Sequence, residues 1–214
     1  MESSSERSMV KRLPERGVYD RDTINRILDE ALICHLGFAT EHGPVAIPTI
    51  HARVGNVLYL HGSRAGRMMR STVDSEVCVT ATIVDGIVAA RSAFHHSLNY
   101  RSVMVFGIPR VVDDKEERTR AFEAITNHVL PGRWDEARQP NEREDKGTKL
   151  LAIDIDEASA KVRTGPPVDD VEDMQSGIWA GVIPLTMQAS APIPAPDLEA
   201  GVDVPPSVIG YSAS

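Results

Sequence analysis

Short runs rich in Val and Ile, separated by tight turns, recur along most of this chain. They span residues 33–40, 44–54, 56–62, 76–86, 99–112, 148–156 and 159–164. Runs of this length are typical of strands, and the short Gly-containing turns between the early ones favour hairpins. Hairpin-linked strands pair antiparallel, so the pattern predicts an antiparallel barrel rather than a parallel sheet with helical crossovers. We expect about six strands, with helices inserted between them.

Three segments have helical features instead. Residues 20–32 can begin at a cap on Asp20 or Asp22, residues 64–73 form a short helix, and residues 114–130 are amphipathic. The apolar stripe of the first helix is Ile24, Ile27, Leu28, Ala31 and Leu32. The inward residues of the last helix are Ala121, Phe122, Ile125 and Val129.

The 214 residues suit one domain with additional ends, and a hydrophobic content of 42% is enough for a core. Residues 1–19 form a polar lead-in that we expect to be partly disordered. The domain itself covers residues 20–190. Residues 191–214 are rich in Pro, Ala and Ser, which predicts an extended tail that either crosses a partner or is disordered.

Membrane and secreted classes are not favoured. No apolar run approaches the roughly 20 residues of a membrane span, and the N-terminal residues lack the apolar core of a secretory signal. The two cysteines, Cys34 and Cys78, each lie in an apolar strand-like run, where a buried reduced thiol is ordinary. We therefore expect a cytoplasmic protein.

The charge is unevenly distributed around a net value of −8. Residues 1–70 hold ten Lys and Arg against eight Asp and Glu, whereas residues 111–214 hold ten against twenty. No Lys or Arg follows Arg163. Nucleic-acid binding needs an extended basic face, which this distribution does not offer, but one local anion pocket is compatible with it.

The most concentrated basic segment follows the strand at residues 56–62. That strand ends in His61-Gly62-Ser63, and Arg64, Arg67 and Arg70 follow with no acid between them. A helix start offers free N–H groups and a positive dipole end, and Arg64 and Arg67 are spaced to share one helical face. Arginine is suited to bidentate contact with phosphate, so the spacing indicates a phosphate site. A solvated basic helix face accounts for the spacing equally well.

A second polar segment precedes the strand at residues 99–112. His95 and His96 are adjacent and cannot chelate from one face, so we expect no metal site. Tyr100, Arg101 and Ser102 can line a pocket for a polar aromatic ligand, although an ordinary loop-to-strand junction has the same composition.

Several of these stretches together resemble a known family. YLHGSRAGRMM, SLNYRSVMVFGIPRVV, VLPGRW, IPTIHAR, EASAKVRTGPP and WAGVIPL are similar to the pyridoxamine 5'-phosphate oxidase-related, FMN-binding split-barrel proteins. The most similar branch is the flavin-nucleotide-binding group that includes the nitroimidazole-reductase proteins. The resemblance covers roughly residues 10–190.

This resemblance implies a six-stranded antiparallel split barrel with flanking helices, built as a homodimer with FMN at the subunit interface. Arg67 would hold the FMN phosphate, with Gly62, Ser63 and Arg64 beside it. Other residues would contact the flavin ring or lie near it: Pro48, Thr49, His61, Tyr100, Arg101, Ser102 and Trp179. Trp179 would cover a flavin face, from the partner subunit, unless it is a core residue.

The function implied is an FMN-dependent oxidoreductase acting on a small organic molecule, nitroaromatic compounds included. His61 is the residue nominated for proton transfer, because imidazole titrates near neutrality. The alternatives are a flavin carrier or sensor without catalysis, or the same fold with a deazaflavin or with heme bound through His35, His51 or His61. True pyridoxamine-phosphate oxidases carry a C-terminal arginine-rich segment, so the absence of basic residues after Arg163 argues against vitamin B6 phosphate as substrate.

Overall fold

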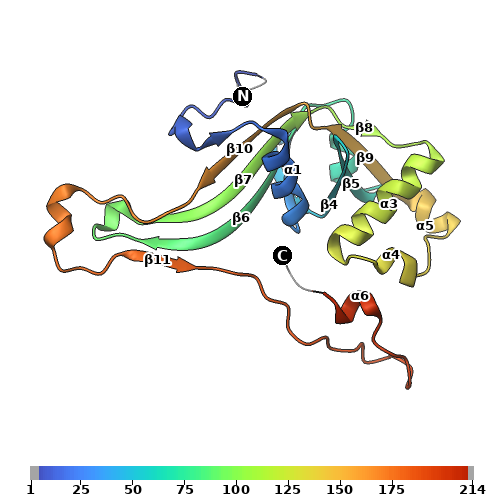
Figure 1. Ribbon diagram of the computed structural model, residues 1–214. Coiled ribbons are helices and arrows are strands. Elements are labelled where there is room, and N and C mark those ends of the chain that lie inside the picture. The colour runs from blue at the N-terminus through green and yellow to red at the C-terminus, as the bar shows by residue number, and fades with distance from the viewer. Residues whose placement is uncertain (1–4, 212–214) are drawn as a thin grey trace.

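The computed structural model describes residues 5–211 and folds most of them into two antiparallel sheets with helices packed around them (Figure 1). The strands are β1 (Gly17–Val18), β2 (Cys34–Thr40), β3 (Gly43–Thr49), β4 (His51–Val54), β5 (Val57–Ser63), β6 (Val77–Ala89), β7 (Ser97–Gly107), β8 (Arg110–Val111), β9 (Thr148–Asp154), β10 (Glu157–Arg163) and β11 (Gly181–Pro184). The α-helices are α1 (Arg21–Glu30), α2 (Arg67–Ser71), α3 (Lys115–Val129), α4 (Arg133–Glu136), α5 (Glu142–Gly147) and α6 (Pro206–Ile209). Short 3₁₀ turns are η1 (Pro14–Arg16), η2 (Ala93–His95) and η3 (Val171–Gln175).

The two sheets are connected by one bend of the chain between β3 and β4. The larger sheet has the order β1-β10-β7-β6-β2-β3, with β11 on the outer half of β6, and the smaller has the order β4-β5-β9-β8. Only Ile50 separates β3 from β4, so the chain passes from the edge of one sheet to the edge of the other. Pro44 and Pro48 lie in β3, where an edge position tolerates their missing N–H groups. This arrangement is the split barrel of the expected fold class, and every strand pair is antiparallel.

Alternation along the strands fills the barrel from both sheets. Leu36, Val79, Val105 and Ile153 are fully buried in one cluster, against which α1 packs Ile27. A second cluster lies between α3 and the smaller sheet, where Ala52, Tyr59, Ala121, Ile125 and Leu150 meet.

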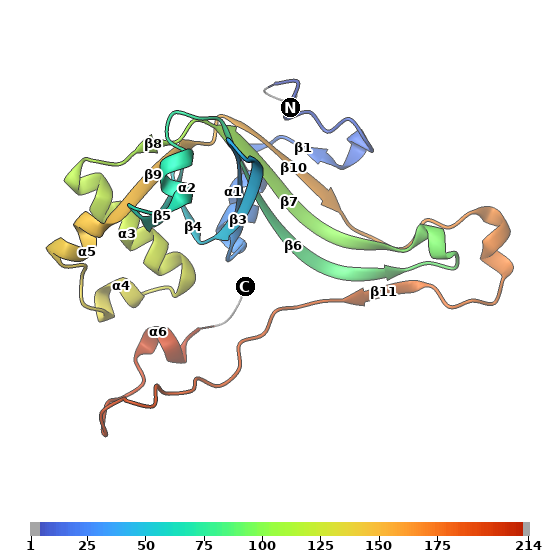
Figure 2. The same cartoon turned by 180° about the vertical axis from the view of Figure 1, so that it is seen from behind.

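A long arm leaves the barrel. The outer halves of β6 and β7 continue beyond it as a hairpin, and β11 pairs with the outer half of β6 (Figures 1 and 2). The chain then returns through residues 185–205, an extended strap, to α6. There the backbone N–H of Ser207 donates to Glu136 of α4 at 3.0 Å. Residues 5–19 lie against β10, and residues 191–211 form the later part of the strap and α6.

The helix predictions are confirmed in part. Asp20 caps α1 by accepting from the Thr23 N–H at 2.8 Å, so the cap is Asp20 rather than Asp22. In α3 the inward position predicted for Val129 is wrong: this last residue of the helix is 39% exposed. Arg118 is buried instead, because its guanidinium ties α3 to the Val112 carbonyl and to Asp145.

Within residues 5–211, no helix has the length and hydropathy needed to cross a bilayer.

Candidate functional site

The turn from β5 into α2 organises the basic segment. The Gly66 N–H donates to the Ser63 carbonyl at 2.8 Å, and the Arg64 N–H donates to the Gly147 carbonyl at 2.9 Å. Gly66 is extended, so the helix begins only at Arg67. The predicted shared helical face of Arg64 and Arg67 is therefore wrong. A helix of five residues also contributes little dipole, so side chains, and not the helix end, define the charge here.

Close packing of α2 against β5 holds the helix in place. Met69 is fully buried, and a Cβ built on Gly62 would lie 2.8 Å from its terminal methyl. Lys149 is the cross-strand neighbour of Gly62 and donates from Nζ to the Met69 carbonyl at 2.9 Å. Sequence analysis missed Lys149, since only the β5–β9 pairing brings it to this turn.

The three arginines of the turn are free of acids. Arg64, Arg67 and Arg70 are exposed, and none takes part in an ion pair within residues 5–211. Arg64 donates through Nε to the Lys146 carbonyl at 3.1 Å, which ties it to the end of α5. Ser63 is exposed beside them. A cluster of guanidinium groups without carboxylates is the arrangement that binds an anion such as phosphate.

His61 lies on the opposite face of β5 from Gly62. Alternation places it with Tyr59, towards α3, whereas Gly62 faces α2. The ring is half-buried, its Nδ1 has no hydrogen-bond partner among the described residues, and burial lowers its pKa. The imidazole is thus neutral near pH 7 and makes no hydrogen bond within residues 5–211.

Pro48 and Thr49 lie where β3 bends into β4. Thr49 pairs with Cys34 on the core face, while Pro48 is exposed on the outer face beside His35. The next strand, β4, pairs with β5 from His51 opposite Leu60 onward. The bend therefore leads directly into the strand that pairs with β5.

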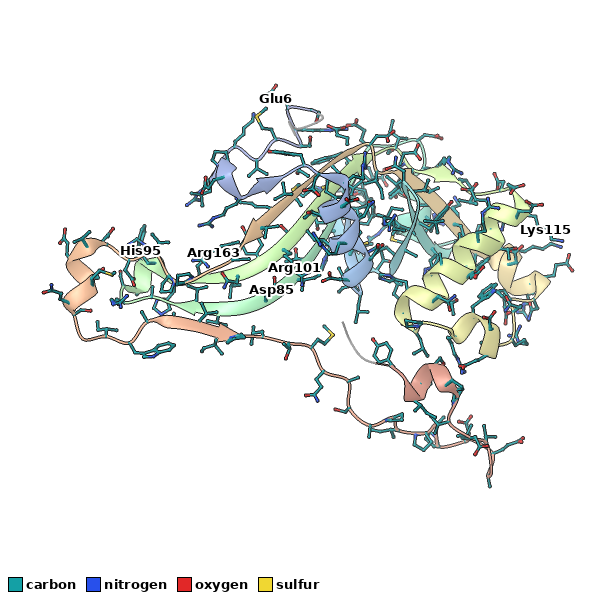
Figure 3. The ribbon with its side chains drawn as sticks, viewed as in Figure 1. Glu6, Asp85, His95, Arg101, Lys115 and Arg163 are labelled. Atoms are coloured by element: carbon teal, nitrogen blue, oxygen red, sulfur yellow. The ribbon has the colours of Figure 1, made fainter. Side chains whose placement is uncertain are left out.

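The three consecutive residues predicted on β7 do not share one face. Arg101 points towards α1 and is held by Asp85 and Glu30 (Figure 3), and Asp85 above all raises its pKa. Tyr100 and Ser102 lie on the other face, where Ser102 donates to the Lys161 carbonyl at 3.3 Å. Arg101 is thus occupied by carboxylates within its own chain.

Trp179 lies on the arm. Its side chain is 67% exposed, and its ring rests on the Gly181 backbone, where a Cβ would come within 2.9 Å of it. Trp179 is therefore not a core residue. Figure 1 shows β11, which begins two residues later, far out along β6 and away from the barrel.

His51 and His35 are the other two histidines that the sequence offers as heme ligands. His51 is fully buried, and its Nε2 is 2.8 Å from the Leu28 carbonyl, which commits that nitrogen. His35 is exposed on β2 and makes no side-chain hydrogen bond or ion pair within residues 5–211. Among the described residues, no three His, Cys, Asp or Glu side chains gather closely enough to ligate a metal ion.

Comparison with known proteins gives a consistent result. Residues 20–162 match the family model described as pyridoxamine 5'-phosphate oxidase. The flavocytochrome Anf3 from Azotobacter vinelandii is 36% identical over 99% of both chains, with a TM-score of 0.93. The FAD and heme binding protein from Mycobacterium smegmatis is 37% identical over 92% of this chain and 97% of that one, with a TM-score of 0.87.

A 5-nitroimidazole antibiotic resistance protein from Bacteroides thetaiotaomicron shares the fold. It is 22% identical over 68% of this chain and 86% of that one, with a TM-score of 0.58. Curated proteins gave no match.

Proposed function

This chain belongs to the pyridoxamine 5'-phosphate oxidase family of flavin-binding split barrels, and on that premise we propose that it is an FMN-dependent oxidoreductase acting on a small organic molecule. The observation that carries the proposal is the acid-free group of Arg64, Arg67 and Arg70 at the β5–α2 turn. A bound flavin would supply the two-electron redox chemistry. The chain's own part is to hold the flavin phosphate and to orient the ring.

Arg67 is the proposed phosphate ligand, assisted by Ser63 and the Gly62 backbone. It is the first residue of α2, and the buried Met69 fixes that helix against β5. Lys149 adds a second cation whose Nζ retains two donors beyond its bond to the Met69 carbonyl. Arg70 lies a turn further along and would contribute less.

Titration of the flavin-free protein tests this assignment. Arg67→Ala should weaken flavin binding by about 1.5–3 kcal/mol, the scale of a hydrogen bond to a charged group. Arg120→Ala is the matched control, since Arg120 is an equally exposed arginine on α3 with only a 4.0 Å contact to Glu116. Equal affinities for the parent and Arg67→Ala would remove Arg67 from the site.

The same titration separates FMN from FAD. The names of two relatives include FAD or a flavocytochrome, which supports flavin binding in general. FMN contains the phosphate nearest the ring, which FAD shares, so Arg67 serves either ligand. We propose FMN as the ligand, and tighter binding of FAD by tenfold or so would overturn that choice.

His61 is the proposed proton-transfer residue. Because burial lowers its pKa, the ring is mostly neutral at pH 7 and must gain a proton before it can pass one on. Turnover that uses His61 should therefore rise as the pH falls below 7. His61→Gln should lower turnover by roughly 10²-fold and flatten this pH profile. An unchanged profile in the variant would assign the ring a structural role.

Heme binding is the second candidate function. Two relatives at 36% and 37% identity are named a flavocytochrome and an FAD and heme binding protein. Of the histidines considered, His51 does not fit, because its Nε2 is committed to a carbonyl, whereas His61 has an uncommitted ring. Hemin added to the protein should then give a Soret band that His61→Ala abolishes and His35→Ala leaves intact. The reverse pattern would assign heme to His35.

The substrate is proposed to be a small, mostly apolar aromatic molecule. Arg163, the last basic residue, is buried, and its guanidinium donates hydrogen bonds to Asn99 and to backbone carbonyls. It is therefore not available to bind a substrate phosphate. Flavin-loaded protein should turn over nitroaromatics or quinones with a nicotinamide donor. Efficient oxidation of pyridoxamine phosphate with oxygen would overturn this choice, and inactivity towards all of these would favour a carrier or sensor.

A homodimer is proposed because the predicted flavin residues are separated in one chain. The β5–α2 turn follows a strand of the smaller sheet, whereas Tyr100 lies on β7 of the larger sheet and Trp179 lies on the arm. A second copy can supply the distant residues to the flavin bound at the first copy's turn.

The cytoplasm is the proposed location. Cys34 and Cys78 are both free thiols, and burial raises the pKa of Cys34 to about 12, which leaves it unreactive. Reduced thiols of this kind are usual in the cytoplasm.

A further inference from the structure

A second basic site lies far from the β5–α2 turn. Residues 7–12 run across the outer face of β7 and β10 and leave a groove with a volume of about 230 Å³. This face belongs to the β1–β10–β7 side of the larger sheet, whereas β3 lies at its other end. Figure 3 shows the N-terminal segment, marked by Glu6, lying above β10. The groove is therefore separate from the proposed flavin phosphate site.

The groove is lined by four cationic side chains and no acidic one: Arg7, Lys11, Arg12 and Lys161. In a chain with a net charge of −8, this concentration of one sign is local. Hydroxyl groups of Ser102 and Ser159 line its floor, and Met9, Val10 and Met104 provide apolar surface.

Acids outside the groove neutralise only part of this charge. Arg7 pairs with Glu157 and with Glu76, the latter at 3.0 Å, and Lys11 pairs with Glu6 at 2.9 Å.

Two cations remain without carboxylates. Lys161 donates from Nζ to the Arg12 carbonyl at 3.0 Å, which leaves two of its three donors. The Arg12 guanidinium is exposed and makes no hydrogen bond or ion pair within residues 5–211.

Arg163, the next residue of β10 on the same face as Lys161, adds to the excess of positive charge. Arg163 is only 6% exposed, and its partners are the Asn99 amide oxygen and the carbonyls of Gly165 and Pro166, none of them charged. Burial lowers its pKa, and the neighbouring Arg16 lowers it further. A buried guanidinium is ordinarily matched by an anion, so the potential along this side of β10 favours a negatively charged ligand.

We propose that this groove binds the phosphate end of a small phosphomonoester of the nucleotide kind. Arg12 and Lys161 would donate to the phosphate oxygens, and the Ser102 hydroxyl would lie beside them. The apolar wall of Met9, Val10 and Met104 would contact the uncharged part of the ligand. The volume is below the roughly 300 Å³ of sites that enclose a drug-sized ligand, so one end of the ligand is held and the rest remains open to solvent.

Calorimetric titration of the flavin-loaded protein tests the proposal with three probes: adenosine 5'-monophosphate, inorganic phosphate and adenosine. The monophosphate should bind, phosphate should compete with it, and adenosine should bind far more weakly. Affinity should fall as salt is raised, because the contact is ionic. Arg12→Gln and Lys161→Gln should each weaken the monophosphate about tenfold or more.

Two control variants locate the binding. Arg120→Gln and Lys115→Gln each remove an exposed charge on α3, away from the groove; both should bind the monophosphate like the parent. No saturable binding by the parent would overturn the proposal, as would affinities unchanged by Arg12→Gln and Lys161→Gln. Release of flavin as the monophosphate is added would place the probe in the flavin site and overturn the proposal equally. Flavin absorbance, recorded in parallel, reports on the flavin site independently.

Discussion

Two histidines at the C-terminal end of α1 show how burial changes the chemistry of a residue. His51 lies with Nε2 at 2.8 Å from the Leu28 carbonyl, and His128 with Nε2 at 2.9 Å from the Ala31 carbonyl. Their ring centroids are 4.7 Å apart. Burial, and after it the nearby His128, lower the pKa of His51 to about 4, while the hydrogen bond to Leu28 and the charge of Asp29 act in the opposite direction. His51 is therefore a neutral donor to α1 in the folded protein.

This pairing predicts loss of stability in mild acid. Above the unfolded pKa of about 6.5, His51 is neutral in both states. As the pH falls from 6.5 to 4, His51 binds a proton in the unfolded chain but stays neutral in the folded chain. Unfolding therefore becomes more favourable by up to roughly 3 kcal/mol. Urea unfolding at pH 7, 6 and 5 should show this slope, and His51→Gln should reduce it. The exposed His42, changed to Gln, is the control; a slope shared by all three proteins would contradict the assignment.

At the scale of elements, the position of α2 depends on two glycines. Gly62 allows Met69 to pack on β5, and Gly66 allows the chain to turn immediately after Ser63. A Cβ on Gly66 would lie 2.9 Å from the Ser63 carbonyl oxygen, which is backbone and cannot swing aside. The hydrogen bond from the Gly66 N–H to that oxygen would be strained as a result.

Gly66→Ala should therefore displace α2 and with it Arg67. We expect a loss of about 1–3 kcal/mol in the free energy of unfolding, the usual cost of overpacking, together with weaker flavin binding. Gly147→Ala is the control at the neighbouring strand start, because nothing lies within 4 Å of its Cβ; its stability should change by no more than about 0.5 kcal/mol. Denaturant unfolding and flavin titration measure both effects, and equal behaviour of the two variants would show that the turn tolerates a side chain.

At the scale of the whole molecule, the arm extends away from the barrel and the strap returns from it to α6 (Figures 1 and 2). The arm exposes large apolar side chains, among them Phe94 at 88% and Trp179 at 67%. The strap is acidic and is anchored at its far end by Ser207 on Glu136. Exposed apolar surface of this extent marks an interaction site, and the proposed homodimer would cover it.

Removal of residues 185–214 tests this role. The full chain should sediment with about twice the mass of one chain at micromolar concentration, and the truncated chain should dissociate at concentrations about tenfold higher or more. Ser207→Ala, which loosens only the anchor, should have a smaller effect. A full-length chain that sediments as a monomer with flavin bound would rule out the dimer, and equal dissociation of full and truncated chains would remove the strap from the interface.

The sequence by itself determined much of the local structure. Alternating Val and Ile runs with short turns predicted the antiparallel strands, because pattern and turn length are local properties. The cap at Asp20 and the apolar stripe through Ile24, Ile27 and Leu28 predicted α1 for the same reason. The bare arginines after Ser63 were visible as a run without acids, and the structure leaves them without acids.

Only the tertiary structure decided which of these residues share a face or a partner. Arg101 is a candidate flavin ligand by sequence, and only the fold shows that Glu30 and Asp85 reach it from two other elements. Lys149 came to the β5–α2 turn, and Lys161 to the N-terminal segment, through contacts between residues far apart in the chain. Strand alternation then placed His61 and Gly62 on opposite faces. Pairing, register and charge compensation are long-range, so residue spacing along the chain does not encode them.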